Sequence, residues 1–120
     1  MSEQNSLSTI VIMADFAGPY AWIRHPGQQF HQSNKHIGDV VLGFSEEYGV
    51  SKKLEEGFAD WEIDFDRNSE KDSFEWKEWN ADGIALAKKL KDEVGDRYLV
   101  EYHIPVEDPG YSPKTAIIKI

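Results

Sequence analysis

Oxygen-bearing side chains recur between residues 64 and 75 at the spacing of a calcium-binding loop. Positions 1, 3, 5, 9 and 12 of this twelve-residue window are Asp64, Asp66, Asn68, Asp72 and Glu75. Calcium prefers clustered oxygen ligands of this kind, so a small divalent-cation-binding module built on residues 64–75 is an alternative function, with weak binding. Two departures oppose it, because Ser69 stands where the loop needs glycine and Lys71 stands where an apolar residue is usual. We therefore expect no metal site here and a solvated acidic connector between two helices, with Asp72 and Glu75 as helix caps.

The histidines give little support to a metal site. Three of the four lie in residues 25–36, a segment without helical or strand periodicity. The spacings between His25, His31 and His36 are five and six residues, unlike the paired ligands of zinc motifs. A polar surface loop is therefore expected. The chain has no cysteine, which excludes disulfides and thiolate metal ligands.

Motifs for catalysis are missing from the sequence. There is no Gly-x-Ser-x-Gly for a nucleophilic serine and no glycine pattern that would bind phosphate. His103 lies close to Glu101 on an expected strand and is a candidate acid–base group. A partly exposed strand histidine without a catalytic role is the more ordinary interpretation. We therefore expect a protein that is not an enzyme and that carries no cofactor.

Negative charge is concentrated in the middle of the chain. The 120 residues carry a net charge of −9, and residues 55–82 contribute −8 of it through eleven acidic and three basic side chains. This balance disfavours nucleic acid and anionic membranes as partners and favours a basic protein. The residues predicted to bind such a partner are Asp60, Asp64, Asp66, Glu70, Glu75, Glu78 and Asp82.

Apolar periodicity places these acids on two amphipathic helices. The first stripe, with intervals of four, three and four, consists of Leu54, Phe58, Trp61 and Phe65. It predicts a helix from an N-cap at Ser51 to about Asp64. A second helix is expected to start at Asp72 or Ser73, where Asp72 and Glu75 have capping-box spacing, and to end near Gly95.

Gly83 lies in the apolar stripe of the second helix. Glycine weakens a helix by about 1 kcal/mol relative to alanine, so its presence predicts close approach of another backbone, with the helix lying tight on the sheet or on its partner helix. Asn80, one turn earlier, is expected to form a hydrogen bond with a neighbouring loop or strand.

Strand patterns flank the two helices. We expect strands at 9–14 and 20–24, joined as a hairpin by a turn at 17–19, and at 98–104 and 115–120. The strand at 98–104 alternates so as to bury one face, and residues 37–44 fit either a strand or an extended lead-in to the helix. The sequence thus predicts an α+β domain over residues 1–120, with residues 1–7 as a loose leader. Its sheet would be antiparallel or mixed, with four to five strands and two helices packed on one face.

The chain is expected to be soluble and cytoplasmic. No apolar run approaches the roughly 20 residues needed to span a bilayer. The first eight residues also lack the basic start and apolar core of a signal peptide.

One stretch resembles a known group of bacterial proteins. Residues 74–90 follow the pattern Phe-x-Trp-x-x-aromatic-Asn-x-x-Gly-x-x-Leu-Ala-x-x-Leu, after an acidic connector and before a strand. This pattern, with the size, acidity and lack of cysteine, resembles immunity proteins of contact-dependent growth inhibition and related polymorphic toxin systems. The resemblance implies an inhibitor that binds a cognate toxin domain, in many cases a basic nuclease. With Trp61 and Phe65 before the connector and the strand at 98–102, the resemblance covers about a third of the chain, mostly core positions, and supplies no binding residues.

Overall fold

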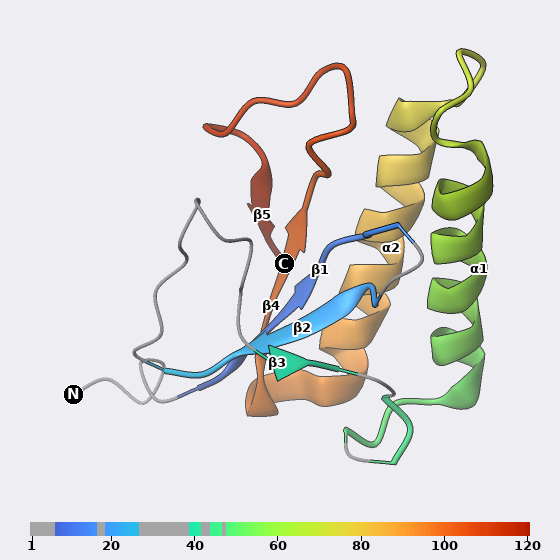
Figure 1. Ribbon diagram of the computed structural model, residues 1–120. Coiled ribbons are helices and arrows are strands. Elements are labelled where there is room, and N and C mark those ends of the chain that lie inside the picture. Colours follow the sequence, from blue (N-terminus) through green and yellow to red (C-terminus); the bar gives the residue numbers. More distant parts are fainter. Residues whose placement is uncertain (1–6, 17–18, 27–38, 42–43, 47) are drawn as a thin grey trace.

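A mixed sheet lies at the centre of the fold. The computed structural model describes residues 7–16, 19–26, 39–41, 44–46 and 48–120. Within these residues the strands are β1 (Thr9–Ile12), β2 (Ala21–Arg24), β3 (Asp39–Val40), β4 (Leu99–His103) and β5 (Ile117–Lys119). Their spatial order is β3-β2-β1-β4-β5 (Figure 1). β1 pairs with β4 in parallel, and the other neighbours are antiparallel.

Two long helices lie on the same side of this sheet (Figure 1). α1 spans Lys52–Asn68 and α2 spans Trp76–Val94, and a short 3-10 turn, η2 (Gly95–Arg97), leads from α2 into β4. The crossover through these helices returns the chain in the direction of β1, which is why β1 and β4 are parallel. The predicted α+β domain, with two helices on one face of a four- to five-stranded sheet, is confirmed for the described residues.

The first helix begins where the sequence predicts but ends later. The Ser51 hydroxyl accepts a hydrogen bond from the Leu54 amide at 3.3 Å, as an N-cap does. α1 then continues to Asn68 rather than stopping near Asp64. The added turn is favoured because Phe65 is fully buried and holds this part of the helix on the core.

The second helix starts later than predicted and ends as predicted. It begins at Trp76, and Glu75 at its N-cap makes no side-chain capping bond. The predicted start at Asp72 or Ser73, with its capping box, was wrong because the residues before Glu75 form turns instead. The helix ends at Val94, and its C-cap Gly95 has a φ of 59°, in the left-handed region that glycine adopts without strain.

A pair of stacked tryptophans joins the two helices. The indole rings of Trp61 and Trp79 are 4.4 Å apart between centroids and within 7° of parallel. Each indole N–H donates to the backbone carbonyl of the other residue at 3.0 Å. A Cβ on Gly83 would approach ring atoms of Trp61 at 2.7 Å and of Tyr102 at 2.6 Å. The prediction that this helix lies tight on the sheet or on its partner helix is confirmed for both, but the groups that approach Gly83 are the rings of Trp61 and Tyr102 rather than another backbone.

A polar relay connects β4, α2 and the segment before β5. The Tyr102 hydroxyl donates to Asn80 Oδ1 at 2.6 Å, and Asn80 Nδ2 donates to Asp108 Oδ2 at 2.8 Å. The other oxygen of Asp108 accepts from the Gly110 amide at 2.8 Å. Burial, with a smaller effect of the Asp108 charge, raises the pKa of Tyr102, so its hydroxyl stays a donor. The hydrogen bonds predicted for Asn80 are confirmed.

Both faces of β4 are buried, whereas the sequence predicts one. Val100 and Tyr102 pack in the core beneath the helices. Glu101 and His103, on the alternate face, are 9% and 4% exposed. The prediction of a partly exposed His103 was wrong because β4 is an interior strand, and Glu101 and His103 satisfy each other by a hydrogen bond.

Some predicted features lie outside the described residues. These are residues 1–6 of the leader, residues 17–18 of the first turn, most of the 25–36 segment including His31 and His36, and residues 37, 38, 42 and 43. In the described part of 37–44, the strand interpretation is confirmed by β3.

Replacing Gly83 with alanine should destabilise the protein. Alanine favours a helix by about 1 kcal/mol over glycine. Its Cβ would, however, meet Tyr102 at 2.6 Å and Trp61 at 2.7 Å, so packed rings would have to move. Because overpacking outweighs helix propensity, we expect Gly83→Ala to lower the free energy of unfolding by about 1–3 kcal/mol, measured by urea denaturation.

Gly57→Ala is the matched control for this prediction. A Cβ at Gly57 would approach the flexible end of the Leu86 side chain, at 3.0 Å. That end can shift, so unchanged or higher stability is expected. A Gly83→Ala variant as stable as the wild type would contradict the close packing of α2.

Candidate functional site

A groove runs along the solvent-exposed side of the junction between α1 and α2. It consists of two adjoining hollows that share Asp64, Trp79 and Asp82. We call this surface the interhelical groove. Its walls carry five carboxylates, and apolar side chains lie between them; these residues are Asp60, Asp64, Glu75, Glu78 and Asp82, with Trp61, Phe74, Trp79 and Leu86.

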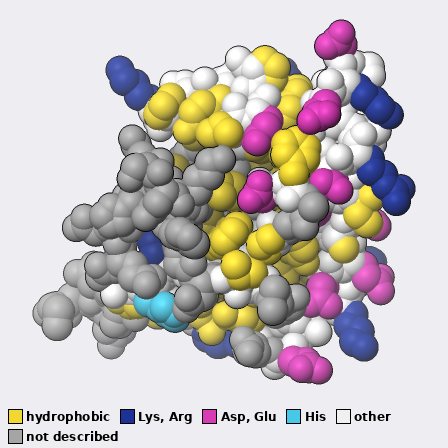
Figure 2. All heavy atoms as spheres, in the orientation of Figure 1, with side chains coloured by type: hydrophobic (Ala, Val, Ile, Leu, Met, Phe, Trp, Pro, Cys, Tyr) yellow, Lys and Arg dark blue, Asp and Glu magenta, His cyan; other side chains and the backbone are white. Residues whose placement is uncertain are grey.

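Helical spacing brings the five carboxylates together. Asp60 and Asp64 are one turn apart on α1, and Glu75, Glu78 and Asp82 follow one another by three or four residues at the start of α2. All five side chains are exposed. Figure 2 shows that Asp and Glu side chains lie mainly over the helical side of the face in view. Five of the seven residues predicted to bind a partner therefore share one surface.

None of these five carboxylates makes an ion pair with a lysine or arginine of the described residues. Two lysines, Lys71 and Lys89, also line the groove. Lys71 Nζ donates to Asn68 Oδ1 at 2.7 Å, and Asn68 Nδ2 donates to Asp64 Oδ1 at 2.7 Å. Like charges this close repel one another, so a cationic partner would find a favourable field here.

The other two predicted residues do not line the groove. Asp66 is exposed on α1 and acts electrostatically on Glu62, which lies toward the β1–β2 side of the helix. Glu70 is exposed in the connector between the helices. The predicted cluster is thus divided by helix geometry, because positions 60 and 64 share a face of α1 that position 66 does not.

The calcium pattern does not form a loop. Asp64, Asp66 and Asn68 lie in the last turns of α1, where a calcium loop would need non-helical backbone. The prediction that the connector begins at residue 64 was therefore wrong, for the reason that Phe65 keeps the helix on the core. Across the part of the chain that the structure describes, no three acidic or histidine side chains converge as metal ligands.

One acid of the central segment is buried rather than exposed. Glu62 is 8% exposed, and its Oε1 accepts a hydrogen bond from the Asp15 amide at 3.2 Å. Burial, strengthened by the charges of Asp66 and Asp15, raises the pKa of Glu62 to about 8. It is therefore mostly protonated at neutral pH and does not add to the acidic surface. The sequence could have indicated this burial, because Glu62 lies four residues after Phe58 and three before Phe65, on the same side of the helix.

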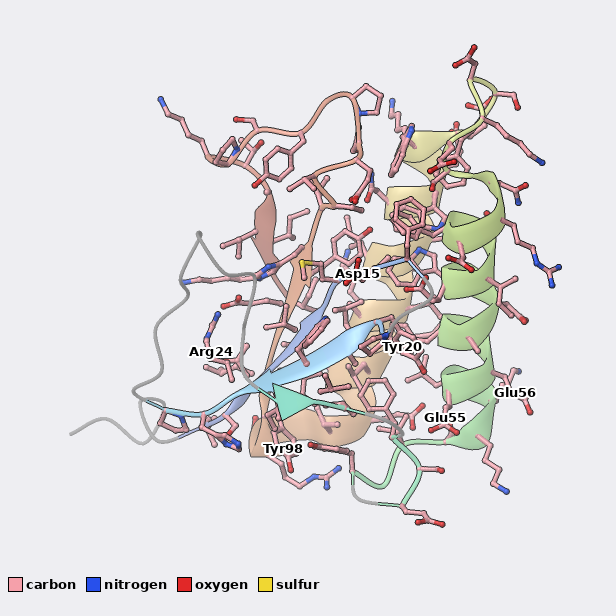
Figure 3. The ribbon with its side chains drawn as sticks, in the orientation of Figure 1. Asp15, Tyr20, Arg24, Glu55, Glu56 and Tyr98 are labelled. Carbon is pink, nitrogen blue, oxygen red and sulfur yellow. The ribbon has the colours of Figure 1, made fainter. Side chains whose placement is uncertain are left out.

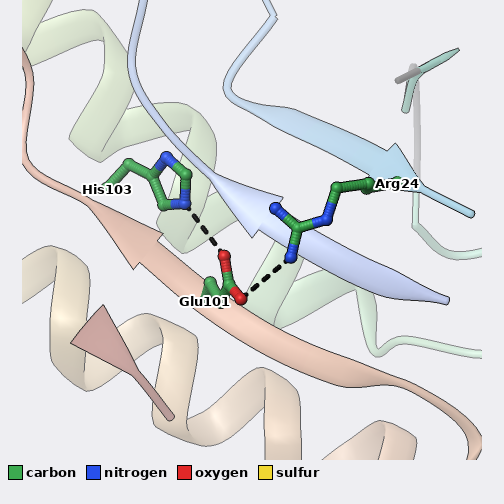
Figure 4. Close-up of polar contacts among 3 residues, drawn as sticks. All are labelled: Arg24, Glu101 and His103. Carbon is green, nitrogen blue, oxygen red and sulfur yellow. Dashed lines mark hydrogen bonds and ion pairs between the residues drawn. The ribbon is translucent and has the colours of Figure 1, made fainter. Parts of the chain in front are cut away.

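A second polar cluster lies on the sheet face opposite the helices (Figure 4). Arg24 of β2 donates to Glu101 Oε2 at 2.9 Å, and His103 Nε2 lies 3.1 Å from Glu101 Oε1. The hydrogen bond with His103, together with Arg24, outweighs burial and lowers the pKa of Glu101 to about 2. Both oxygens of Glu101 are engaged, so the cluster ties β4 to β2 across β1 rather than offering an acid–base group to solvent.

Known proteins do not assign this chain to a family. Comparisons with family models, with curated proteins and with solved structures gave no match. Within the described residues, no helix has both the length and the apolar character needed to cross a membrane. The function is therefore inferred from the shape and charge of the interhelical groove.

The Glu101 cluster should make stability fall in acid. Its carboxyl has a pKa of about 2 in the folded protein against an ordinary 4.5, so its stabilising effect is complete above the ordinary value and is lost as the pH falls toward 2. Between pH 5 and pH 3 this loss amounts to about 2 kcal/mol of unfolding free energy. Glu101→Gln should remove that part of the acid dependence in urea titrations.

Glu107→Gln serves as the control, because Glu107 is exposed and lies outside the cluster. It should keep the acid dependence of the wild type. If Glu101→Gln showed the same loss between pH 5 and pH 3 as the wild type, the ion pair with Arg24 and the bond to His103 would not hold Glu101 ionised.

Proposed function

We propose that this protein is an immunity protein of a bacterial contact-dependent growth inhibition or related toxin system. It binds a cognate toxin domain and covers the active or substrate-binding surface of that domain, in the cytoplasm and without catalysis. The observation that carries this proposal is the interhelical groove, whose five carboxylates are exposed and have no ion pair with a described lysine or arginine.

A basic nuclease is the class of toxin that this surface fits. Nucleases hold the phosphate backbone with lysine and arginine. A row of carboxylates offers those side chains negative charge, as the phosphates do. Complementary fields accelerate encounter and discriminate against partners of the wrong charge. Inhibition then requires occupation of the basic surface, for which the groove needs no reactive group.

The apolar residues of the groove add contact area to this charge. Phe74 and Leu86 are half-buried, so part of each side chain remains available to a partner. Trp61 and Trp79 lie beneath them and hold the floor in place. Stable interfaces combine an apolar centre with a charged rim, and the groove has both parts.

The resemblance of residues 74–90 to immunity proteins supports the proposal through the fold. Within that stretch, Trp79, Asn80, Gly83 and Leu90 are buried. These positions determine how α2 packs, whereas the exposed acids beside them would determine which partner is bound. Two proteins with the same buried pattern can therefore bind different toxins.

Neutralising the groove should slow binding of the toxin domain. The triple variant Asp64→Asn, Glu78→Gln, Asp82→Asn removes three charges from the walls and keeps the side-chain sizes. The partner to use is the toxin domain encoded beside the gene for this protein. At low ionic strength the association rate, measured by stopped-flow fluorescence, should fall by about 10-fold or more, and the difference should shrink as salt is added.

A second triple variant distinguishes the effect of the groove on binding from the effect of net charge. Asp92→Asn, Asp96→Asn, Glu107→Gln changes the net charge by the same amount at exposed positions outside the groove. It should bind nearly as fast as the wild type and protect cells that produce the toxin, while the groove variant protects them poorly. Equal rates for the two triple variants, or no protection by the wild type, would contradict the proposal.

A further inference from the structure

Glu62 lies between α1 and the turn that joins β1 to β2. Its side chain is 8% exposed, and Oε1 accepts from the Asp15 amide at 3.2 Å. Its second oxygen, Oε2, is buried without a hydrogen-bond partner in the described part of the chain. An ionised carboxylate with one unsatisfied oxygen is costly to bury, whereas the protonated acid carries no charge. The Asp15 amide bond favours the ionised form, but burial outweighs it, so the site as a whole favours the neutral form.

The polar groups around Glu62 also disfavour a negative charge there. Asp15 approaches from the β1–β2 turn, and Asp66 lies one helical turn further along α1. Tyr20, at the far end of the turn, has its pKa raised to about 12 by burial and by the charges of Glu55 and Glu62. Figure 3 shows Asp15 and Tyr20 beside α1, which carries Glu55. Among the residues that the structure describes, no basic side chain acts on the pKa of Glu62.

Two ring contacts complete the docking of this turn on α1. Phe16 packs on Phe65 with 4.7 Å between centroids, and Tyr20 stacks on Phe58 at 5.4 Å. Phe65 in turn stacks on Trp79 at 5.2 Å, beneath the interhelical groove. Release of the turn would therefore remove packing from a residue that supports the groove.

We propose that residues 13–16, at the start of the β1–β2 turn, are a proton-dependent clamp on α1, which is held closed by protonated Glu62 and opens more readily once Glu62 ionises. In the open state water hydrates the carboxylate, whereas in the closed state the carboxylate is buried. The pKa of Glu62 is about 8 when the clamp is closed, against an ordinary 4.5. Opening therefore becomes easier as the pH rises toward 8 and changes little above that value.

Amide hydrogen exchange at Asp15, followed by nuclear magnetic resonance, tests this clamp. The Asp15 amide is protected by its bond to Glu62 and is exposed when the turn opens. After correction for the intrinsic rate, its protection in the wild type should fall about 50-fold between pH 6 and pH 8 and then level off. A wild-type protection factor that does not change with pH would overturn the proposal.

Two variants of the full chain identify the responsible group. Glu62→Gln, which stays neutral, should show protection at Asp15 that is independent of pH. Glu56→Gln, at an exposed position of the same helix, should behave like the wild type. The same fall in Glu62→Gln as in the wild type would overturn the proposal.

A second measurement uses the wild type alone. The side-chain carboxyl resonance of Glu62 should titrate with a midpoint that matches the pH at which exchange at Asp15 levels off. A midpoint near the ordinary carboxyl value of 4.5 would overturn the proposal.

Discussion

The stacked pair of Trp61 and Trp79 is the contact on which the rest of the structure depends. Its two reciprocal hydrogen bonds of 3.0 Å fix the distance and rotation of α1 relative to α2. Because Gly83 has no side chain, the pair can lie directly against Tyr102 and therefore against the sheet. Once this contact forms, the inward faces of the helices fill the core and their outward faces become the two walls of the interhelical groove.

Burial sorts the acidic side chains into three electrostatic states. Glu62 is buried away from basic groups, and its raised pKa keeps it neutral near pH 7. Glu101 is buried with Arg24 and His103, and its lowered pKa keeps it ionised. The groove carboxylates are exposed and make no ion pair with a lysine or arginine of the described residues. Negative charge is thus neutralised or compensated inside the protein, whereas the five groove carboxylates are exposed together on one surface, an arrangement that suits the proposed basic partner.

The sequence predicts what depends on local periodicity and misses what depends on tertiary contact. The N-cap at Ser51, the end of α2 at Gly95 and the close approach at Gly83 follow from residue type and spacing, and each is confirmed. The later end of α1 could not be read locally, because it depends on packing between Phe65 and the β1–β2 turn. The burial of Glu62 likewise depends on what covers α1. The five groove carboxylates were among the seven predicted residues, since helical spacing groups two of them on α1 and three at the start of α2. Their meeting across the groove depends on the packing of the two helices.

A double-mutant cycle between Trp61 and Trp79 tests most directly whether this pair organises the fold. The free energy of unfolding would be measured for Trp61→Phe, for Trp79→Phe and for the double variant, each of which loses indole hydrogen bonds while keeping an aromatic ring. A stacked and reciprocally bonded pair predicts that the second substitution costs less once the first is made, with a coupling energy of about 1–3 kcal/mol. Additive effects of the two substitutions would contradict the account.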